Sequence, residues 1–224
     1  MIKKICEVIT KINKLGYKAY LIGGSSRDYL LSRSFLDVDI TTNAPINILE
    51  ANFKVIDEKG KSLGSIKIEY KNLIIEITRF RKESYDENNI YPHIEFVNSE
   101  YEDALRRDFT INAIYLNIIN NQIIDPFNGL NDLMAFKVKF IGNPEDRIKE
   151  DPTRIIRALR ISNKLNFNLE NNTNIAIKEN IKELKKIPIK KYQNEIIKTI
   201  QELGIEKAKK IFNEYNMEVE NYEY

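Results

Sequence analysis

The first half of the chain alternates between two patterns of apolar residues. Over residues 3–15 apolar side chains recur at helical spacing and stop at Gly16, which predicts an amphipathic helix. Shorter apolar runs, bounded by Gly, Asn and charged residues, predict strands with short helices between them. The predicted strands cover residues 18–22, 36–42, 53–57, 65–70 and 73–80, and the short helices cover residues 26–32 and 45–51.

The pattern changes along the second half. A polar segment at residues 82–93 predicts a loop, and Tyr101–Leu105 predicts a short helix. Asn-containing turns at Lys71-Asn72 and Asn120-Asn121 predict hairpins. After Gly142 the spacing is helical, with predicted helices over residues 151–165, 171–182, 189–201 and 203–214. We therefore expect a mixed α+β domain over residues 1–140 and an all-helical domain over residues 141–224.

Composition limits the class of protein. With 224 residues, 42% of them hydrophobic, the chain can bury a core, and no apolar run approaches the roughly 20 residues of a membrane span. A single cysteine, Cys6, excludes an internal disulfide, and a single histidine, His93, excludes a histidine cluster. We expect a protein of the reducing cytoplasm whose metal ligands are carboxylates.

Charge is nearly balanced, with a net value of +2, and does not by itself require a nucleic-acid partner. Lysines and arginines gather at residues 137–164 and 178–210, where acidic residues are mixed with them. A basic stripe and a helical surface laced with salt bridges both fit this distribution.

Candidate chemistry begins within residues 20–42. Asp37 and Asp39 stand two apart in a predicted strand, so both carboxylates project from one face. Gly23-Gly24 supplies a tight turn before a helix start whose N–H groups can bind phosphate, with Arg27 as a forked donor. Two carboxylates on one face attract cations, and a pair of Mg²⁺ ions there would activate a hydroxyl and hold a triphosphate.

Each motif also has an ordinary interpretation. Asp-x-Asp is found on solvated strand edges, and Gly-Gly is a common turn. Their order here, strand, turn, helix and strand, favours a metal-dependent phosphate site. Glu76 lies between Ile75 and Ile77 in a predicted strand, where it either faces solvent or joins the metal site.

A second charged group lies at residues 150–160. Asp151 followed by Pro152 is typical of a helix N-cap and first helical position, which gives Asp151 a structural role. Arg154, Arg157 and Arg160 follow at three-residue intervals on one helix surface. Three such charges repel one another unless they bind an anion or acidic side chains.

Asp151 and Arg154 can also read the edge of a nucleobase. The carboxylate accepts from an exocyclic amino group while the guanidinium donates to the neighbouring ring nitrogen. Cytosine and adenine present that order of groups, whereas uracil and guanine present the reverse. The pair would therefore accept CTP and ATP and leave buried groups unpaired with UTP or GTP.

Together and in this order, the motifs resemble the bacterial tRNA nucleotidyltransferase and poly(A) polymerase family over residues 18–168. A later segment, Lys191-Tyr192-x-x-Glu195, is weakly similar to a helix of that family that usually carries arginine. The segments that carry the resemblance are Gly23-Gly24-x-x-Arg27-Asp28, Asp37-x-Asp39, Arg106-Arg107-Asp108-Phe109-Thr110-Ile111-Asn112-Ala113, Asp125-x-x-x-Gly129-x-x-Asp132 and Glu150-Asp151-x-x-Arg154-x-x-Arg157-x-x-Arg160.

The resemblance implies a polymerase-β-like head, a mixed sheet with flanking helices, followed by a helical neck that selects the nucleotide. It implies that Asp37 and Asp39 bind the catalytic metal, and Glu76 is a third candidate catalytic residue. Asp151 and Arg154 would form the protein template for CTP and ATP. The nucleotide-binding residues that it implies are Gly23, Gly24, Arg27, Arg106, Arg107, Asp108, Asn112, Asp151, Arg154, Arg157 and Arg160.

The expected function is Mg²⁺-dependent addition of CMP and AMP, from CTP and ATP, to the 3′ end of tRNA. The motifs leave open addition of CC only or of A only, poly(A) synthesis and, more remotely, a nucleotide-binding module without catalysis. Family members usually continue through body and tail domains that grip tRNA. We therefore expect a second copy or a partner protein to supply that grip, and no association with a membrane.

Overall fold

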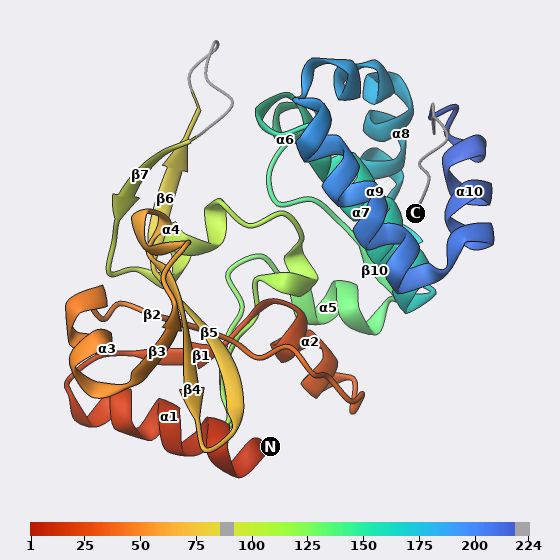
Figure 1. The fold of residues 1–224 in the computed structure, drawn as a ribbon. Coiled ribbons are helices and arrows are strands. Elements are labelled where there is room, and N and C mark those ends of the chain that lie inside the picture. The colour runs from red at the N-terminus through yellow and green to blue at the C-terminus, as the bar shows by residue number, and fades with distance from the viewer. Residues whose placement is uncertain (86–91, 218–224) are drawn as a thin grey trace. The chain divides into compact units, whose positions relative to one another are not determined.

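The computed structural model describes residues 1–85 and 92–217 (Figure 1). These residues form two compact units, one that ends at residue 130 and one that begins at residue 131. The sequence pattern predicted a domain boundary near residue 140. The two units are described separately below.

A mixed sheet forms the centre of the first unit. Its strands follow the order β3-β4-β5-β2-β1-β8-β9. Within the sheet as described, β2 pairs with β5 in parallel and the other neighbours pair antiparallel. The strands are β1 (Ala19–Leu21), β2 (Asp39–Thr42), β3 (Lys54–Asp57), β4 (Ser65–Tyr70), β5 (Leu73–Arg79), β8 (Tyr115–Asn117) and β9 (Gln122–Ile124). The predicted α+β class is confirmed.

The core lies on one face of this sheet, under α1 (Ile2–Lys14) and α3 (Ile46–Asn52). Helix α1 buries Ile5, Val8, Ile9 and Ile12, the spacing that places side chains on one helical face. These side chains pack with the inward residues of the strands and with Leu49 of α3 in a single buried cluster. The helix predicted over residues 3–15 is confirmed.

Strand alternation sends the intervening side chains to the opposite face. Ile40 and Ile77 are fully buried in the core cluster, so their neighbours Asp39 and Glu76 project away from it. On that opposite face Tyr20 and Tyr115 pack edge to face, with ring centroids 5.9 Å apart. This unit also contains the helices α2 (Gly23–Leu30) and α4 (Glu100–Leu105) and the 3₁₀ turns η1 (Lys61–Leu63) and η2 (Thr110–Asn112).

Two local predictions for this unit were wrong. Residues 82–93 were expected to form a loop, but Arg81–Ser84 and His93–Phe96 pair antiparallel as β6 and β7, and the part of the predicted loop at 86–91 lies outside the described residues. The strand predicted over residues 36–42 begins only at Asp39, because Leu36 is 90% exposed and does not enter the core. Asp37 therefore precedes the strand.

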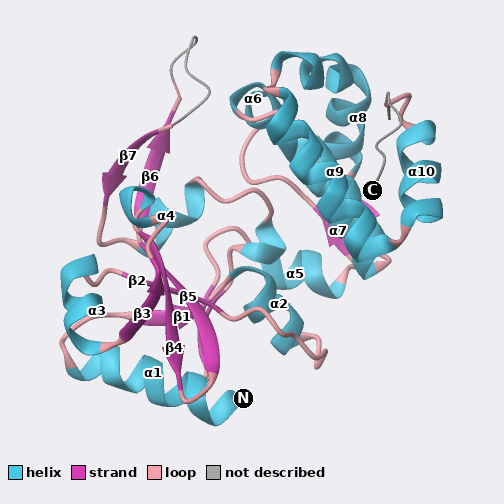
Figure 2. Cartoon of the chain, viewed as in Figure 1, coloured by secondary structure: helices cyan, strands magenta, loops and turns pink. Residues whose placement is uncertain are grey.

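The second unit is mainly helical (Figure 2). Its helices include α6 (Pro144–Glu150), which was not predicted and is capped by Asn143, whose side chain accepts from the N–H groups of Glu145 and Asp146. A short parallel pair of β10 (Lys137–Val138) and β11 (Asn168–Leu169) corrects the all-helical prediction. The remaining elements are α7 (Thr153–Leu165), α8 (Asn171–Asn180), η3 (Ile181–Lys186), α9 (Ile189–Leu203) and α10 (Ile205–Glu214), while α5 (Gly129–Met134) spans the division between the units.

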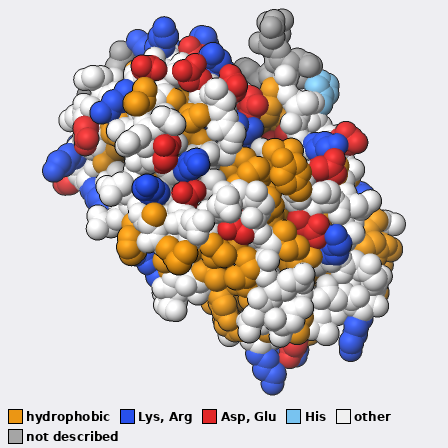
Figure 3. All heavy atoms as spheres, turned by 180° about the vertical axis from the view of Figure 1, so that it is seen from behind, with side chains coloured by type: hydrophobic (Ala, Val, Ile, Leu, Met, Phe, Trp, Pro, Cys, Tyr) orange, Lys and Arg blue, Asp and Glu red, His pale blue; other side chains and the backbone are white. Residues whose placement is uncertain are grey.

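Surface charges of the second unit pair with one another. Lys164 binds Glu202, Lys186 binds Glu183 and Lys198 binds Glu195. On the face drawn in Figure 3, basic and acidic side chains are intermingled. This favours the salt-bridged surface over the basic stripe. No helix in the described part of the chain is long and apolar enough to cross a membrane.

Gly129 provides a test of the packing in the first unit. Its N–H and that of Leu130 donate to the Asp125 carboxylate at 2.7 and 2.9 Å, and a Cβ at position 129 would overlap the backbone carbonyl of Thr110. Gly129→Ala should therefore lower the free energy of unfolding by about 1–3 kcal/mol and the Tm by several degrees, measured by thermal denaturation. Asn131→Ala, at an exposed position of the same helix, should change Tm little. Equal Tm values for the two variants would contradict this packing.

Candidate active site

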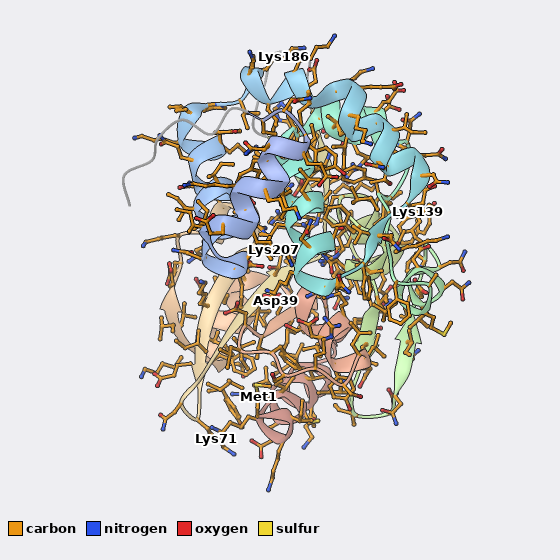
Figure 4. All side chains as sticks on the ribbon, turned by 90° about the vertical axis from the view of Figure 1, so that its right-hand side faces the viewer. Met1, Asp39, Lys71, Lys139, Lys186 and Lys207 are labelled. Atoms are coloured by element: carbon orange, nitrogen blue, oxygen red, sulfur yellow. The ribbon has the colours of Figure 1, made fainter. Side chains whose placement is uncertain are left out.

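The register of the parallel pair brings two carboxylates together. Asp39 on β2 lies opposite Glu76 on β5, and the Glu76 N–H donates to the carbonyl of Val38 at 2.9 Å. Both residues line a cavity of about 500 Å³. The described residues that line it are Ile22, Gly23, Asp39, Asp57, Lys59, Gly60, Leu63, Ser65, Ile66, Lys67, Glu76, Thr78, Arg81, Arg106 and Arg107. Figure 4 labels Asp39 and Lys71 at different ends of the first unit. Lys71 belongs to the turn between β4 and β5.

Negative charge is concentrated at Asp39. Burial, and next to it the charges of Glu76 and Asp37, raise the pKa of its carboxyl to about 6, against the opposing effect of Arg107 and Lys67. A buried carboxyl that loses its proton only near neutral pH, with other carboxylates close by, marks a place where a cation would be stabilised.

Glu76 is held in place by its neighbour strand. Its Oε1 accepts from the Ser65 hydroxyl at 2.8 Å, and its Oε2 lies 3.8 Å from Nζ of Lys67. Both partners come from β4, which pairs with β5 in antiparallel register. The sequence motifs did not identify Ser65 or Lys67, because only the register of β4 brings them to this site.

Asp37 occupies a different position from Asp39. It is exposed, it precedes β2, and among the described residues it does not contribute to the lining of the cavity. Its charge nevertheless raises the pKa of Asp39, so the two carboxylates are close enough to interact. Asp37 thus lies two residues before the first residue of β2, Asp39, and not within the strand.

Helix α2 begins against these aspartates. Gly23 has a φ of +68°, and a Cβ on it would approach Oδ2 of Asp39 to 3.3 Å, so glycine suits both the backbone and the space. The buried hydroxyl of Ser25 donates to the Asp37 carbonyl and accepts from the Asp39 N–H, each at 2.9 Å. The sequence analysis missed Ser25, which ties the helix to the Asp-x-Asp segment.

Arg27 is buried and bound within the protein. Its Nε and Nη2 donate to the two carboxylate oxygens of Asp28 at 2.9 and 3.0 Å, and Nη1 donates to Oδ1 of Asn112 at 2.8 Å. The fork that was expected to face phosphate thus binds Asp28. Gly24 lies beside this group, since a Cβ on it would stand 3.5 Å from Nη2 of Arg27.

Arg106 and Arg107 follow α4 and line the cavity. Arg106 Nε and Arg107 Nη2 each donate to Asp103 at 2.8 Å, one to each carboxylate oxygen. Asp108 is half-buried in the bend between α4 and η2. The sequence motifs did not identify Asp103, although a carboxylate three and four residues before two arginines is a recognisable helical ion-pair spacing.

The carboxylates at this site suit a hard divalent cation. Within the described residues no cluster of three or more His, Cys, Asp or Glu side chains forms a ready-made cage. Mg²⁺ is commonly bound through one or two carboxylates together with substrate phosphates and water. Asp39, with its raised pKa, and the neighbouring Asp37 and Glu76 fit that mode of binding.

Asp151 lies between α6 and α7 in the second unit, and its side chain is buried. Its Oδ1 accepts from the Thr153 hydroxyl at 2.7 Å and N–H at 3.2 Å, the contacts expected of a helix cap. Arg157 donates to Oδ2 at 2.9 Å and Lys191 to Oδ1 at 3.2 Å. Burial opposes ionisation, but Arg157, Thr153 and Lys191 outweigh it and hold the pKa of Asp151 below its ordinary value.

The three arginines of α7 have acidic partners of their own. Arg154, 1% exposed, donates to Glu150 at 2.7 Å, while Arg157 binds Asp151. Arg160 donates to Glu195 of α9 at 2.6 Å. Arg154 was expected beside Asp151; its charge helps to lower the pKa of Asp151, so the two lie close, and it also binds Glu150. The acids that offset this basic helix lie in α6, the turn after it and α9, not in α7 itself.

Known proteins resemble this chain in both units. A family model described as the poly(A) polymerase head domain matches residues 19–139. A CCA-adding enzyme of Lactobacillus helveticus is 42% identical over 197 residues, which cover 87% of this chain and 49% of that protein. A CCA-adding enzyme of Staphylococcus epidermidis is 35% identical over 216 residues, 96% of this chain and 53% of that protein.

Solved structures show the same similarity. The Bacillus stearothermophilus CCA-adding enzyme in complex with CTP superimposes with a TM-score of 0.84 at 32% identity, over 95% of this chain and 51% of that one. A tRNA nucleotidyltransferase complexed with a primer tRNA and an incoming ATP analogue gives a TM-score of 0.73 at 29% identity, over 93% and 60% of the two chains. This chain spans about half the length of the curated relatives it matches. It belongs to the family defined by the poly(A) polymerase head domain.

Proposed function

We propose that this chain is the catalytic and nucleotide-selecting part of a Mg²⁺-dependent tRNA nucleotidyltransferase. It adds CMP and AMP, from CTP and ATP, to the 3′ end of tRNA in the cytoplasm. The observation that carries the proposal is the pairing of Asp39 with Glu76 in one cavity with Gly23, Arg106 and Arg107. The names of the relatives, CCA-adding enzymes, support tRNA as the substrate.

The head, residues 1–140, carries the transfer chemistry in this proposal. Asp37, Asp39 and Glu76 hold Mg²⁺, which when bound offsets phosphate charge and makes a hydroxyl more acidic. The terminal ribose hydroxyl of tRNA attacks the α-phosphate of the nucleotide, and pyrophosphate leaves. The residues that bind the triphosphate and ribose are Gly23, Gly24, Arg27, Arg106, Arg107, Asp108 and Asn112.

The neck, residues 141–224, selects the base. Asp151 accepts from the amino group of cytosine or adenine, and Arg154 donates to the adjacent ring nitrogen. Arg157 and Arg160 support this pocket through their pairs with Asp151 and Glu195.

Incorporation into defined tRNAs tests this function. Purified protein with Mg²⁺, CTP and ATP should extend tRNAs that end at the discriminator base, at C and at CC to a complete CCA end, read by sequencing. Asp39→Ala should lower the rate at least 10³-fold, because a charge-stabilising group is lost from the reacting centre, while the far-UV CD spectrum stays unchanged.

Other products would identify other functions. Arrest at CC, or addition of A only to the CC substrate, would indicate a partial transferase, and long A tails on unrelated RNA would indicate poly(A) synthesis. Nucleotide binding without incorporation would favour a non-catalytic module. Any of these results would contradict complete CCA addition by this chain.

The raised pKa of Asp39 predicts a pH-dependent stability. A carboxyl whose pKa is raised to about 6 stabilises the fold at low pH and loses that contribution as pH rises through 6. The Tm of Asp39→Asn minus that of the unaltered protein, measured without divalent metal, should therefore increase by a few degrees between pH 4 and pH 7. Millimolar Mg²⁺ at pH 7 should reduce the difference, and a difference that is flat with pH and indifferent to Mg²⁺ would contradict this electrostatic account.

Asp151→Ala separates base selection from helix capping. If Asp151 reads the base, the ratio of kcat/KM for CTP over UTP should fall at least tenfold, with a smaller change in CTP affinity. The matched control is Asn143→Ala, which removes the cap of α6 at a cost of about 1 kcal/mol and should leave the ratio unchanged. If the ratio of kcat/KM for CTP over UTP is unaltered in Asp151→Ala, Asp151 acts only as a helix cap.

A further inference from the structure

Asp103 on α4 is a buried carboxylate that the proposed chemistry does not use. Its side chain is 0% exposed. Oδ1 accepts from Arg106 Nε at 2.8 Å and from the backbone N–H of Arg81 at 3.1 Å. Oδ2 accepts from Arg107 Nη2 at 2.8 Å and from the Tyr115 hydroxyl at 2.6 Å. One carboxylate thus contacts the guanidinium groups of Arg106 and Arg107 and the backbone of Arg81, three arginines that line the cavity.

This arrangement keeps Asp103 charged in spite of its burial. Burial alone would raise the pKa of its carboxyl, but the charges of Arg107 and Arg106 and the hydrogen bond from Tyr115 outweigh it and hold the pKa far below the ordinary value. A buried charge is tolerated only where its partners are well placed. Asp103 in turn fixes the arginines, because a buried acceptor holds the long side chains of Arg106 and Arg107 in place.

We propose that Asp103 is a positioning residue, which holds Arg106 and Arg107 at the cavity wall for the triphosphate of the incoming nucleotide. Guanidinium groups bind phosphate strongly when their planes are fixed in advance, because less side-chain entropy is lost on binding. This inference rests on the proposed nucleotidyltransferase function. It extends that function by naming the residue that orients the triphosphate-binding groups.

The same cluster reaches the β6–β7 hairpin. Arg81 on β6 donates its N–H to Asp103 and pairs with Glu83 through Nη2 at 2.6 Å, and Glu83 lies 3.6 Å from Nη1 of Arg106. Arg106 is therefore placed between Asp103 and Glu83. Loss of the Asp103 carboxylate should alter the orientation of the Arg106 side chain as well as that of Arg107, since it binds both.

Glu100 supplies a matched comparison on the same helix. It too is a buried carboxylate, 9% exposed, and it too accepts from a tyrosine hydroxyl, that of Tyr20 at 2.9 Å. Its ion-pair partner in the structure is Lys18, which is not part of the cavity lining among the described residues. Glu100→Gln therefore reproduces the loss of a buried charge from α4 without touching the arginines.

The experiment compares Asp103→Asn with Glu100→Gln. Binding of CTP, ATP and GTP is measured by equilibrium dialysis with Mg²⁺, and Tm is measured for each variant. Both variants should lose thermal stability, but only Asp103→Asn should weaken CTP and ATP binding at least tenfold and by similar factors. The preference for CTP over GTP should persist in it, because Asp151 and Arg154 are unaltered.

Tyr115→Phe covers the case in which Asp103→Asn does not fold. It removes one hydrogen bond to Asp103 and keeps the carboxylate and both arginines, so CTP binding should weaken about two- to fivefold. Wild-type affinity in a folded Asp103→Asn variant, or in Tyr115→Phe where Asp103→Asn is unfolded, would overturn the inference. So would absence of CTP binding by the unaltered protein. If the unaltered protein binds CTP but does not extend tRNA, the proposed function fails while the binding data still decide the role of Asp103.

Discussion

Repulsion among carboxylates on one face of the first unit's sheet sets conditions that much of its structure meets. The parallel register of β2 and β5 places Asp39 opposite Glu76, and Asp37 adds a third negative charge nearby. Strand pairing alone would make this arrangement costly. Lys67 and Arg107 act to lower the pKa of Asp39, but burial and the two neighbouring carboxylates keep it raised. A site that remains short of positive charge is suited to receive a cation, and a fully neutralised one would not be.

In the second unit the charges that repel one another are positive. Three arginines at three-residue spacing on α7 would repel one another, yet each finds a carboxylate within 2.9 Å, in Glu150, Asp151 and Glu195. These partners come from α6, from the turn after it and from α9. The arginines therefore link the helices of this unit, and the pair of Arg160 with Glu195 connects α7 to α9 in addition to their apolar contacts.

Sequence periodicity predicted the features that depend on neighbouring residues. Alternation in β2 and β5 was enough to place Asp39 and Glu76 on a polar face, and the helical spacing of α1 identified its buried side. The contacts of Ser25 and Lys67 could not be predicted, because they depend on which strands and helices meet in three dimensions, whereas the pairs of Asp103 with Arg106 and Arg107 follow a local helical spacing that the motifs overlooked. The position of Asp37 was also missed: Leu36 continues the apolar pattern of the sequence, yet it is 90% exposed and β2 begins only at Asp39.

The contacts of Asp151 and Arg154 indicate how a base would enter the neck. Each side chain already has partners, so a nucleobase must exchange with them or use the remaining lone pairs and N–H groups. The Lys191 side chain is 36% exposed and can return to water when a base approaches Asp151. Arg154 is held by Glu150 and by the carbonyl of Arg147, both at 2.7 Å, and its side chain is 2% exposed. Release of a buried arginine costs more than release of a half-exposed lysine. In the proposed pocket Asp151 would therefore change partners when a base binds, and Arg154 would stay in place as the donor to the ring nitrogen.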